Sequence, residues 1–349
     1  MKKVMVVLMA LCTAAALFTG CGKKEEGTQA ASGGNAQAEA GAGQVVWPEG
    51  AVNFSVPGKA GGGSDMTARY LTSGWSEVAD VNFSVKNFDS TTACFQDVAN
   101  QKPDGRNIGL AHSAIMTEYV AGSSPVNPVE DLTVIAAVGN NGLRCIAARS
   151  DAPYDTIDEM VAYAKENPGT IKVGSSPSGT VKFLMGKIEQ GFGITFNYVE
   201  ASQETDRLVN LAGGFIDIGT ISLSNGMEYE AAGKLKVLGT VGADGVKIVD
   251  FLPDAPENYR TVQEMGYDVA AVTSYYVIGP KGMDDALVEA INGSMKEIAA
   301  TGSTFIDGMS DMGQVGGWHG VEDSRRMYEE ELASMIEVGK NLGLYNAQQ

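Results

Sequence analysis

The sequence has few of the side chains that commonly perform catalysis. It has two histidines, His112 and His319, and no H-E-x-x-H, C-x-x-C or G-x-S-x-G motif. His112 follows an expected strand, where it is either a ligand contact or a structural histidine, and His319 is expected in a surface loop. Because no acid/base pair is recognisable, the sequence favours a binding protein over an enzyme, without catalytic residues, metal or cofactor.

Cysteine is scarce as well. Of the four cysteines, Cys12 falls in the apolar run at the N-terminus and Cys21 comes three residues after the end of that run. Cys94 and Cys145 stand far apart in the rest of the chain. Two single cysteines at this separation are weak evidence for a disulfide, so we expect two free thiols.

Basic residues are outnumbered by acidic ones, 25 to 43, which gives a formal net charge of −18. A strongly acidic surface repels nucleic acid and anionic lipid at long range, so we expect no nucleic-acid partner. Any anion that this protein binds must therefore be held by a local site. The acidic run 329–331 is expected on the solvated face of a late helix.

Long apolar runs are missing after the first residues. Two lysines precede the apolar segment 4–18, which is too short for a comfortable membrane span and is typical of a signal peptide, 1–20. The segment 17–21 resembles a bacterial lipobox, which predicts acylation of Cys21; the alternative is an ordinary signal peptide with an incidental cysteine. Residues 21–44 lack large apolar side chains and are expected to form a flexible linker.

A glycine-rich segment is the strongest local signal. Val52, Phe54 and Val56 alternate with polar residues and predict a strand, which Gly61–Gly63 follow. Ser64 or Asp65 is expected to cap a helix that starts near residue 66. Free N–H groups at a helix N-terminus favour an anion, and Lys59 adds a positive charge.

Neither of two better-known glycine motifs fits this segment. A P-loop needs Gly-Lys-Ser/Thr at its end, whereas Ser64 and Asp65 follow the glycines here. A dinucleotide fingerprint fails because Met66 stands where the last glycine should be. The alternative that remains is a tight turn between strand and helix without a ligand.

A second loop repeats the pattern of strand, small polar residues and helix. It is the segment 174–180, Gly-Ser-Ser-Pro-Ser-Gly-Thr. Because ligands of open α/β sheets bind outside the carboxyl ends of strands, the two loops predict a cleft between two lobes. A serine-rich turn without a ligand is the alternative.

Short strands alternate with helices along the chain, which predicts an α/β fold. The expected architecture is a two-lobed, periplasmic-binding-protein-like fold of type II, with a ligand cleft between the lobes. The expected boundaries are 45–143 for the first part of lobe 1, 144–269 for lobe 2 and 270–349 for the return to lobe 1.

The folded part resembles the substrate-binding proteins of tripartite tricarboxylate transporters, the Bug-type extracytoplasmic receptors. The segment 56–69 carries the most specific match, and Lys102–Gly105, the 175–180 loop and Ala212–Asp217 match further family segments. The resemblance implies a receptor whose lobes close on a small carboxylate, held largely by backbone N–H groups, hydroxyls and water.

The residues expected to bind the ligand come from the segments that match the family. They are Lys59, Ala60, Gly61, Gly62, Gly63, Asp65, Thr91, His112, Ser113, Ser175, Ser176, Gly179, Thr180 and Thr220. The segment 87–94 carries hydroxyls where the family has a glycine- and asparagine-rich loop, and the segment 200–206 is acidic where the family has an aromatic-basic-glycine turn. These departures make a ligand with an amino group, or an unusual acid, plausible.

The predicted function follows from this resemblance and from the N-terminus. We expect a lipoprotein on the extracytoplasmic face of the bacterial cell membrane, on the periplasmic side in a Gram-negative cell. It would bind a small organic carboxylate as a monomer and deliver it to the large and small integral membrane subunits of a transporter. The alternatives are an exported hydrolase-like enzyme that acts on a small anion, and an adhesive or scaffolding lipoprotein.

Overall fold

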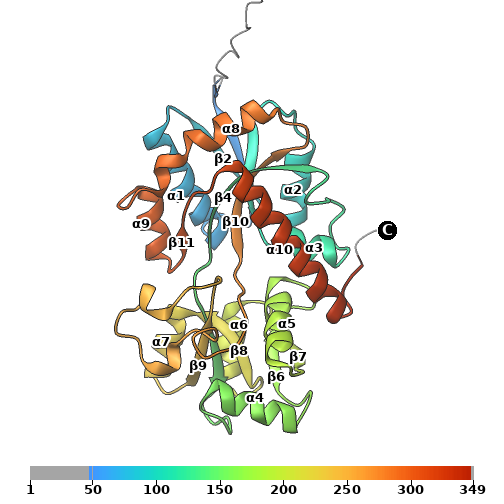
Figure 1. The fold of residues 1–349 in the computed structure, drawn as a ribbon, viewed down its shortest axis with the longest axis vertical. Coiled ribbons are helices and arrows are strands. Elements are labelled where there is room, and N and C mark those ends of the chain that lie inside the picture. Colours follow the sequence, from blue (N-terminus) through green and yellow to red (C-terminus); the bar gives the residue numbers. More distant parts are fainter. Residues whose placement is uncertain (1–46, 49, 347–349) are drawn as a thin grey trace, which may run out of the picture. The chain divides into compact units, whose positions relative to one another are not determined.

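The structure is a computed structural model that describes residues 47–48 and 50–346, and its strands and helices alternate as an α/β fold requires (Figure 1). The predicted fold class is confirmed. The predicted signal peptide, the lipidated Cys21 and the linker 21–44 lie outside the described residues.

Apolar residues at every second position build the first sheet. Val52, Phe54 and Val56 of the first strand are fully buried, whereas Asn53 is exposed. The sheet order is β2 (Phe83–Phe88), β1 (Val52–Pro57), β3 (Asn107–His112), β10 (Ser274–Pro280), β4 (Leu132–Asn140) and β11 (Val315–Gly316). Strand β1 runs parallel to β2 and β3, and β10 runs antiparallel to both β3 and β4.

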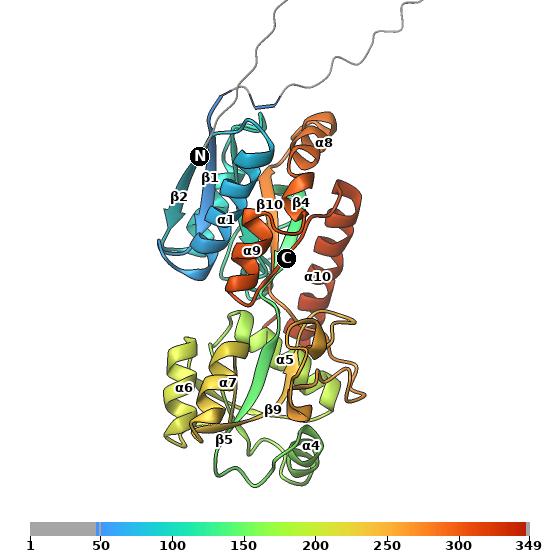
Figure 2. The same ribbon diagram turned by 90° about the vertical axis from the view of Figure 1, so that its left-hand side faces the viewer.

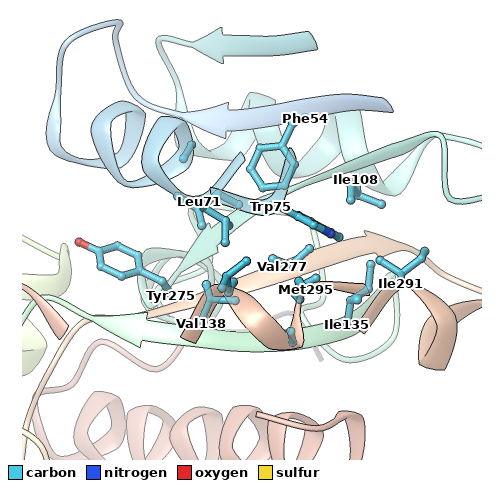
Figure 3. Close-up of a cluster of buried hydrophobic side chains, with 14 of the residues drawn as sticks. Phe54, Leu71, Trp75, Ile108, Ile135, Val138, Tyr275, Val277, Ile291 and Met295 are labelled. Atoms are coloured by element: carbon cyan, nitrogen blue, oxygen red, sulfur yellow. The ribbon is translucent and has the colours of Figure 1, made fainter. Parts of the chain in front are cut away.

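Two apolar clusters, one on each face of this sheet, form its cores. Figure 3 shows the cluster in which Phe54, Trp75 and Val277 pack together. Helices that contribute to this cluster are α1 (Gly63–Val78), α8 (Asp285–Ser294) and α9 (Thr304–Asp311). Helices of the opposite face are α2 (Thr91–Ala99), α3 (Ala114–Val120) and α10 (Val321–Asn341).

The second sheet is built from the middle of the chain. Its order is β7 (Asn197–Glu200), β6 (Lys172–Ser175), β8 (Ile218–Ser222), β5 (Arg144–Arg149) and β9 (Leu235–Val241). Along β5, Ile146 packs with one apolar cluster and Cys145 with the other, as period-two alternation requires. Helices α4 (Ile157–Glu166) and α5 (Thr180–Phe192) belong to the first cluster, and α6 (Glu204–Ala212) and α7 (Leu223–Ala231), side by side in Figure 2, belong to the second.

Two segments connect the sheets. One is the short stretch 141–143 between β4 and β5, and the other is 242–273 between β9 and β10. The two segments are tied together, because the Asn141 backbone N–H donates to the Thr273 carbonyl at 3.0 Å and the Thr273 N–H donates to Asn141 Oδ1 at 2.9 Å. The lobe boundaries 45–143, 144–269 and 270–349 stay a prediction.

Some local expectations were wrong. Helix α1 begins at Gly63, and Gly62 is its N-cap without a side-chain hydrogen bond, so neither Ser64 nor Asp65 caps it. Asp65 lies within the first turn, where its carboxylate accepts the Gly61 N–H instead. Helix α8 ends at Ser294, and the 3-10 helix Lys296–Ala299 follows it, so the pattern of one long helix suggested by this segment is interrupted.

Other expectations were confirmed. Cys94 and Cys145 are free and buried, and burial raises the pKa of both thiols, that of Cys145 to about 12. Trp75 is fully buried in the core, and His319 is exposed. In the part of the chain that the structure describes, no helix combines the length and apolar character needed to cross a membrane.

Candidate functional site

A cavity of about 250 Å³ lies where the two connections leave the sheets. It collects residues from the ends of strands, from helix α5 and from both connections. Its lining residues are Ser113, Asn141, Arg144, Thr180, Val181, Leu184, Lys187, Thr220, Ala271, Val272, Thr273, Tyr275, Gln314 and Met335. The predicted ligand residues among them are Ser113, Thr180 and Thr220.

The position of the cavity follows from the strand directions. Strands β3 and β4 end near it, directly before Ser113 and Asn141. The antiparallel β5 begins there with Arg144, and Tyr275 is the second residue of the antiparallel β10. This is the edge at which open α/β sheets bind ligands, because polar loop groups gather beyond the strand ends.

The charges that line the cavity are positive. Arg144 and Lys187 are its charged lining residues, and no carboxylate stands among the residues that line it. Burial lowers the pKa of Lys187, and the charge of Glu331 opposes that shift. In the described part of the chain, Lys187 makes no ion pair within 4.0 Å.

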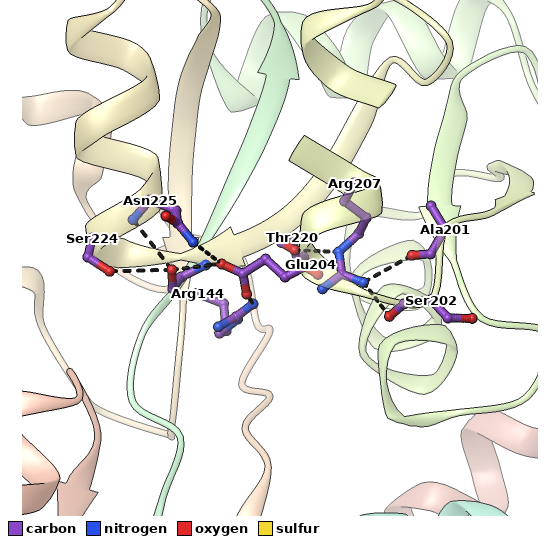
Figure 4. Close-up of polar contacts among 9 residues, drawn as sticks. Arg144, Ala201, Ser202, Glu204, Arg207, Thr220, Ser224 and Asn225 are labelled. Atoms are coloured by element: carbon purple, nitrogen blue, oxygen red, sulfur yellow. Dashed lines mark hydrogen bonds and ion pairs between the residues drawn. The ribbon is translucent and has the colours of Figure 1, made fainter. Parts of the chain in front are cut away.

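Arg144 is held by a carboxylate from the first turn of α6. Figure 4 shows that its guanidinium pairs with Glu204, whose other oxygen accepts from the Ser222 N–H at 2.8 Å and from Asn225 Nδ2 at 2.6 Å. Burial alone would raise the pKa of Glu204, but the positive charge of Arg144 and these hydrogen bonds outweigh it and lower the pKa to about 2. Glu204 is therefore ionised and fixes the position of Arg144.

Thr220 contributes a hydroxyl that has no partner. Its side chain is 1% exposed, and among the described residues its Oγ1 is one of the few buried polar atoms without a hydrogen bond. The N-terminus of α5 lines the same cavity through Thr180 and Val181. The first N–H groups of a helix have no partner within the helix, so a hydroxyl and helix donors meet here.

The first sheet supplies hydroxyls whose hydrogens are already used. Ser113 Oγ donates to Glu331 at 2.5 Å and accepts from the Ser274 N–H at 2.9 Å, and Tyr276 donates to the same carboxylate at 2.7 Å. Glu331 is therefore a bonded group behind the cavity wall. The expectation that the whole 329–331 run is a solvated face was wrong at this residue, because α10 turns it toward β3 and β10.

The glycine loop does not line this cavity. Lys59 and Gly61–Gly63 are exposed. The Gly61 N–H donates to Asp65 at 2.8 Å, and the Gly62 N–H donates to the Lys59 carbonyl at 3.0 Å, so two of the loop donors are already bonded. The loop is linked to the cavity through α1, because Thr67 Oγ1 donates to the cavity residue Gln314 at 3.0 Å.

Asp65 has a structural position. It is 2% exposed and binds the Gly61 N–H and Arg69 Nε. Burial raises the pKa of Asp65, but its hydrogen bonds with Arg69 and Gly61 outweigh this and lower it.

The remaining predicted residues also lie outside this cavity. His112 Nδ1 accepts the Ala114 N–H at 3.2 Å, and burial lowers the pKa of this histidine to about 4, so it is neutral at pH 7. Thr91 is the first residue of α2. In the second loop, Ser175 Oγ donates to the Ser176 carbonyl, and Ser176 Oγ accepts the Gly179 N–H. Ala60 is exposed in the glycine loop.

Several cavity residues were missed from the sequence. They are Asn141, Arg144, Lys187, Thr273, Tyr275 and Gln314, together with the apolar lining. Ligand residues were expected after the ends of parallel strands. Arg144 does not fit that rule because it begins an antiparallel strand, and Lys187 does not fit it because it lies two turns into α5. The short link 141–143 between two apolar strands is the signal that could have found Asn141 and Arg144.

Comparison with known proteins identifies relatives of this fold and sequence. The family model described as "Tripartite tricarboxylate transporter family receptor" matches residues 81–344, a range that begins after the glycine loop. A UPF0065 protein of Bordetella pertussis is 25% identical over 306 residues, which cover 86% of this chain and 91% of the relative.

Solved structures share the fold. A TctC solute-binding protein from Polaromonas, solved without ligand, superposes with a TM-score of 0.71 at 23% identity and covers 85% of this chain and 100% of its own. An R. palustris protein solved with adipate gives a TM-score of 0.67 at 21% identity, over 85% of this chain and 99% of its own. MatC from Rhodopseudomonas palustris, solved with malate, gives 0.63 at 18% identity, over 84% of this chain and 99% of its own.

Proposed function

The chain belongs to the family of tripartite tricarboxylate transporter receptors, and from this premise we propose that it binds a small organic carboxylate in the cavity lined by Arg144, Lys187 and Thr220. Family membership makes it a solute-binding receptor that works outside the cytoplasm, and not an enzyme. The recognition made from the sequence is thereby confirmed.

The observation that carries the proposal is the chemistry of the cavity wall. Arg144 and Lys187 supply positive charge, Thr220 supplies an unpartnered hydroxyl, and α5 supplies free N–H groups. A carboxylate is a planar anion with several acceptor sites, so it can satisfy a guanidinium, a hydroxyl and backbone donors together. Two structural relatives, one solved with adipate and the other with malate, support the same ligand class.

The apolar part of the lining accommodates the body of the ligand. Val181, Leu184 and Met335 stand beside the polar groups. Ligand pockets commonly combine an apolar wall with a few polar groups that fix orientation. A carboxylate on a short carbon chain matches this wall.

We propose that the glycine loop joins the site when the two sheets approach one another around the ligand. Two connections that are hydrogen-bonded to each other suit a hinge closure of this kind. The exposed loop then brings its remaining N–H groups and Lys59 toward the ligand. The other predicted residues, in the loops after β3 and β6 and at Thr91 of α2, contact the ligand together with the glycine loop in this closed state.

The proposal includes a lipid anchor and a transporter. Cys21 is acylated and holds the protein at the membrane, from which it delivers ligand, as a monomer, to the large and small integral membrane subunits. The lipobox-like segment 17–21 supports the anchor, and two acyl chains would make it stable, since a single chain binds a membrane only reversibly. Replacing Cys21→Ser should move the protein from washed membranes to the soluble fraction, and a variant that stays in the membranes would contradict the anchor.

Ligand binding is tested by a screen of organic acids that includes adipate and malate. A ligand at about 100 times its dissociation constant should stabilise the fold by roughly 2.7 kcal/mol, measured by thermal unfolding. Small-angle scattering should show a more compact particle when the ligand is bound. If cationic or neutral solutes stabilise the protein and no acid does, the carboxylate assignment is wrong.

A further inference from the structure

Arg207 is a buried arginine that lies directly behind the cavity. It is 3% exposed. Its Nε donates to the carbonyl of the cavity residue Thr220 at 2.8 Å, and its Nη1 donates to the carbonyls of Ala201 at 3.1 Å and Ser202 at 2.8 Å (Figure 4). Across the described residues, no carboxylate lies within ion-pair distance of it. A buried charge normally has such a partner.

The side chain of Arg207 packs against two glycines of the second sheet. A Cβ at Gly174 of β6 would lie 3.1 Å from Arg207 Cγ and 2.6 Å from Ile216 Cδ1, whereas one at Gly219 of β8 would lie 3.6 Å from Arg207 Cβ and Cδ, an ordinary van der Waals contact. These glycines directly follow Val173 and Ile218, which pair across the two parallel strands. The missing side chain of Gly174 therefore leaves room for the arginine stem, and Gly219 packs against it.

The charges around this end of the cavity do not balance. Arg144 and Arg207 are positive, and Glu204 is the partly buried carboxylate between them. Burial and, to a lesser degree, the charge of Arg144 lower the pKa of Arg207 to about 10, against the opposing charges of Glu204 and the exposed Asp206. Arg207 therefore stays charged at pH 7, and one positive charge is left without a counter-ion within ion-pair distance among the residues that the structure describes.

We propose that Arg207 selects the charge of the ligand: its buried, unpaired guanidinium favours a fully ionised group next to Thr220 over a neutral group of the same shape. The inference rests on the proposed function, because it concerns the same cavity. Two full charges in a partly buried site attract each other with little screening, whereas a neutral amide offers only a dipole. Arg207 acts through its charge and not as a hydrogen-bond donor to the ligand, since its hydrogen bonds go to the backbone carbonyls of Thr220, Ala201 and Ser202.

The test compares an acid with its amide. The full-length chain is titrated by calorimetry with adipate, adipamide, malate and malamide. The wild type should prefer the acid to the amide by at least ~100-fold, and Arg207→Met should reduce that preference about ten-fold by weakening the acid alone. Arg207→Lys keeps the charge and should retain most of the preference.

Two further variants make the test specific. Arg207→Gln removes the charge but keeps a donor for the carbonyls, and it replaces the methionine variant if that one does not fold. Arg149→Met is the matched control, because Arg149 lies at the far end of β5 and pairs with Asp151 and Asp217. It removes one positive charge from the same sheet and should leave the preference unchanged.

The outcomes separate this inference from the function on which it rests. An unchanged preference in Arg207→Met and Arg207→Gln, or an equal loss for acid and amide, overturns the charge-selecting role and leaves the receptor standing. A wild type that binds neither acid nor amide overturns the proposed binding of these carboxylates and this inference together.

Discussion

Two helix N-termini of this protein each place a carboxylate in the first turn, and they use it differently. In α1, Asp65 accepts the Gly61 N–H and binds Arg69, so it stabilises the exposed glycine loop. In α6, Glu204 binds Arg144, which lines the cavity. Asp65 thus uses one N–H donor of the glycine loop, whereas Glu204 holds Arg144 in the cavity wall. The glycine-rich loop is the strongest signal in the sequence, but it does not form the wall of the cavity.

Among the variants considered, removal of the Arg144 guanidinium should have the largest effect on ligand affinity. We expect Arg144→Met to weaken carboxylate binding about 100-fold, roughly 2.7 kcal/mol, because a positioned guanidinium forms charge-assisted hydrogen bonds with a carboxylate. Calorimetric titration with the acid found in the screen measures the effect.

The double variant Arg144→Met with Glu204→Gln is the control, since it avoids leaving Glu204 ionised without its partner. It should bind as weakly as the single variant. Near-normal binding by the double variant would show that the unpaired carboxylate, rather than the lost guanidinium, weakens the ligand.

Acid should reveal how differently the two carboxylates are stabilised. The folded-state pKa of Glu204 is lowered to about 2, below its unfolded value of about 4.3, so its stabilising contribution is present above pH ~4.3 and is lost as the pH falls toward 2. We expect that contribution to be on the order of 2 kcal/mol. Denaturant unfolding between pH 5 and 2 should therefore show a shallower loss of stability in Glu204→Gln.

Asp65→Asn provides the comparison for that measurement. The pKa of Asp65 is lowered as well, through Arg69 and the Gly61 N–H. Its variant should also flatten the pH dependence, but less than Glu204→Gln does, because Arg69 is largely exposed. The opposite order would reverse the roles assigned to the two first turns.

A side chain in the glycine loop should have an intermediate effect. Gly62 has φ −79°, which any residue tolerates, but a Cβ there would lie 3.1 Å from the Lys59 carbonyl. If the loop closes on the ligand, we expect Gly62→Val to weaken binding about ten-fold, roughly 1.4 kcal/mol, because the valine side chain would occupy space that the ligand needs beside the loop. Circular dichroism must first show that the variant is folded, and full affinity would place the ligand away from the loop.

Lys59→Met should have the smallest effect. The residue is exposed, so its charge remains solvated and its attraction for an anion is screened. We expect a two- to three-fold loss of affinity, about 0.5 kcal/mol, that diminishes as salt is raised. A loss larger than that of Arg144→Met would mean that the loop, not the cavity wall, carries the main cation of the site.

Much of the fold follows from local patterns. Alternating apolar residues mark β1, the Gly213–Gly214 pair ends α6, and Thr156 caps α4 by accepting the Glu159 N–H, as its capping-box pattern predicts. The short helix α9 has no comparable local pattern, because its apolar face is narrow and includes Gly308, where a Cβ would lie 2.3 Å from the Tyr70 ring. Only the packing against α1 explains that glycine.

The sequence by itself determined the α/β class, the family and the two polar loops, because these depend on the spacing of residues along one segment. Only the tertiary structure decided that Arg144, Lys187 and Thr220 share a cavity, since they come from β5, α5 and β8. It also decided that Glu204 of the acidic segment 200–206 pairs with Arg144, whereas Arg207 makes no ion pair in the described part of the chain and donates to backbone carbonyls. The pairing of charged side chains depends on how strands and helices pack in three dimensions, and the spacing of residues along the sequence does not specify that packing.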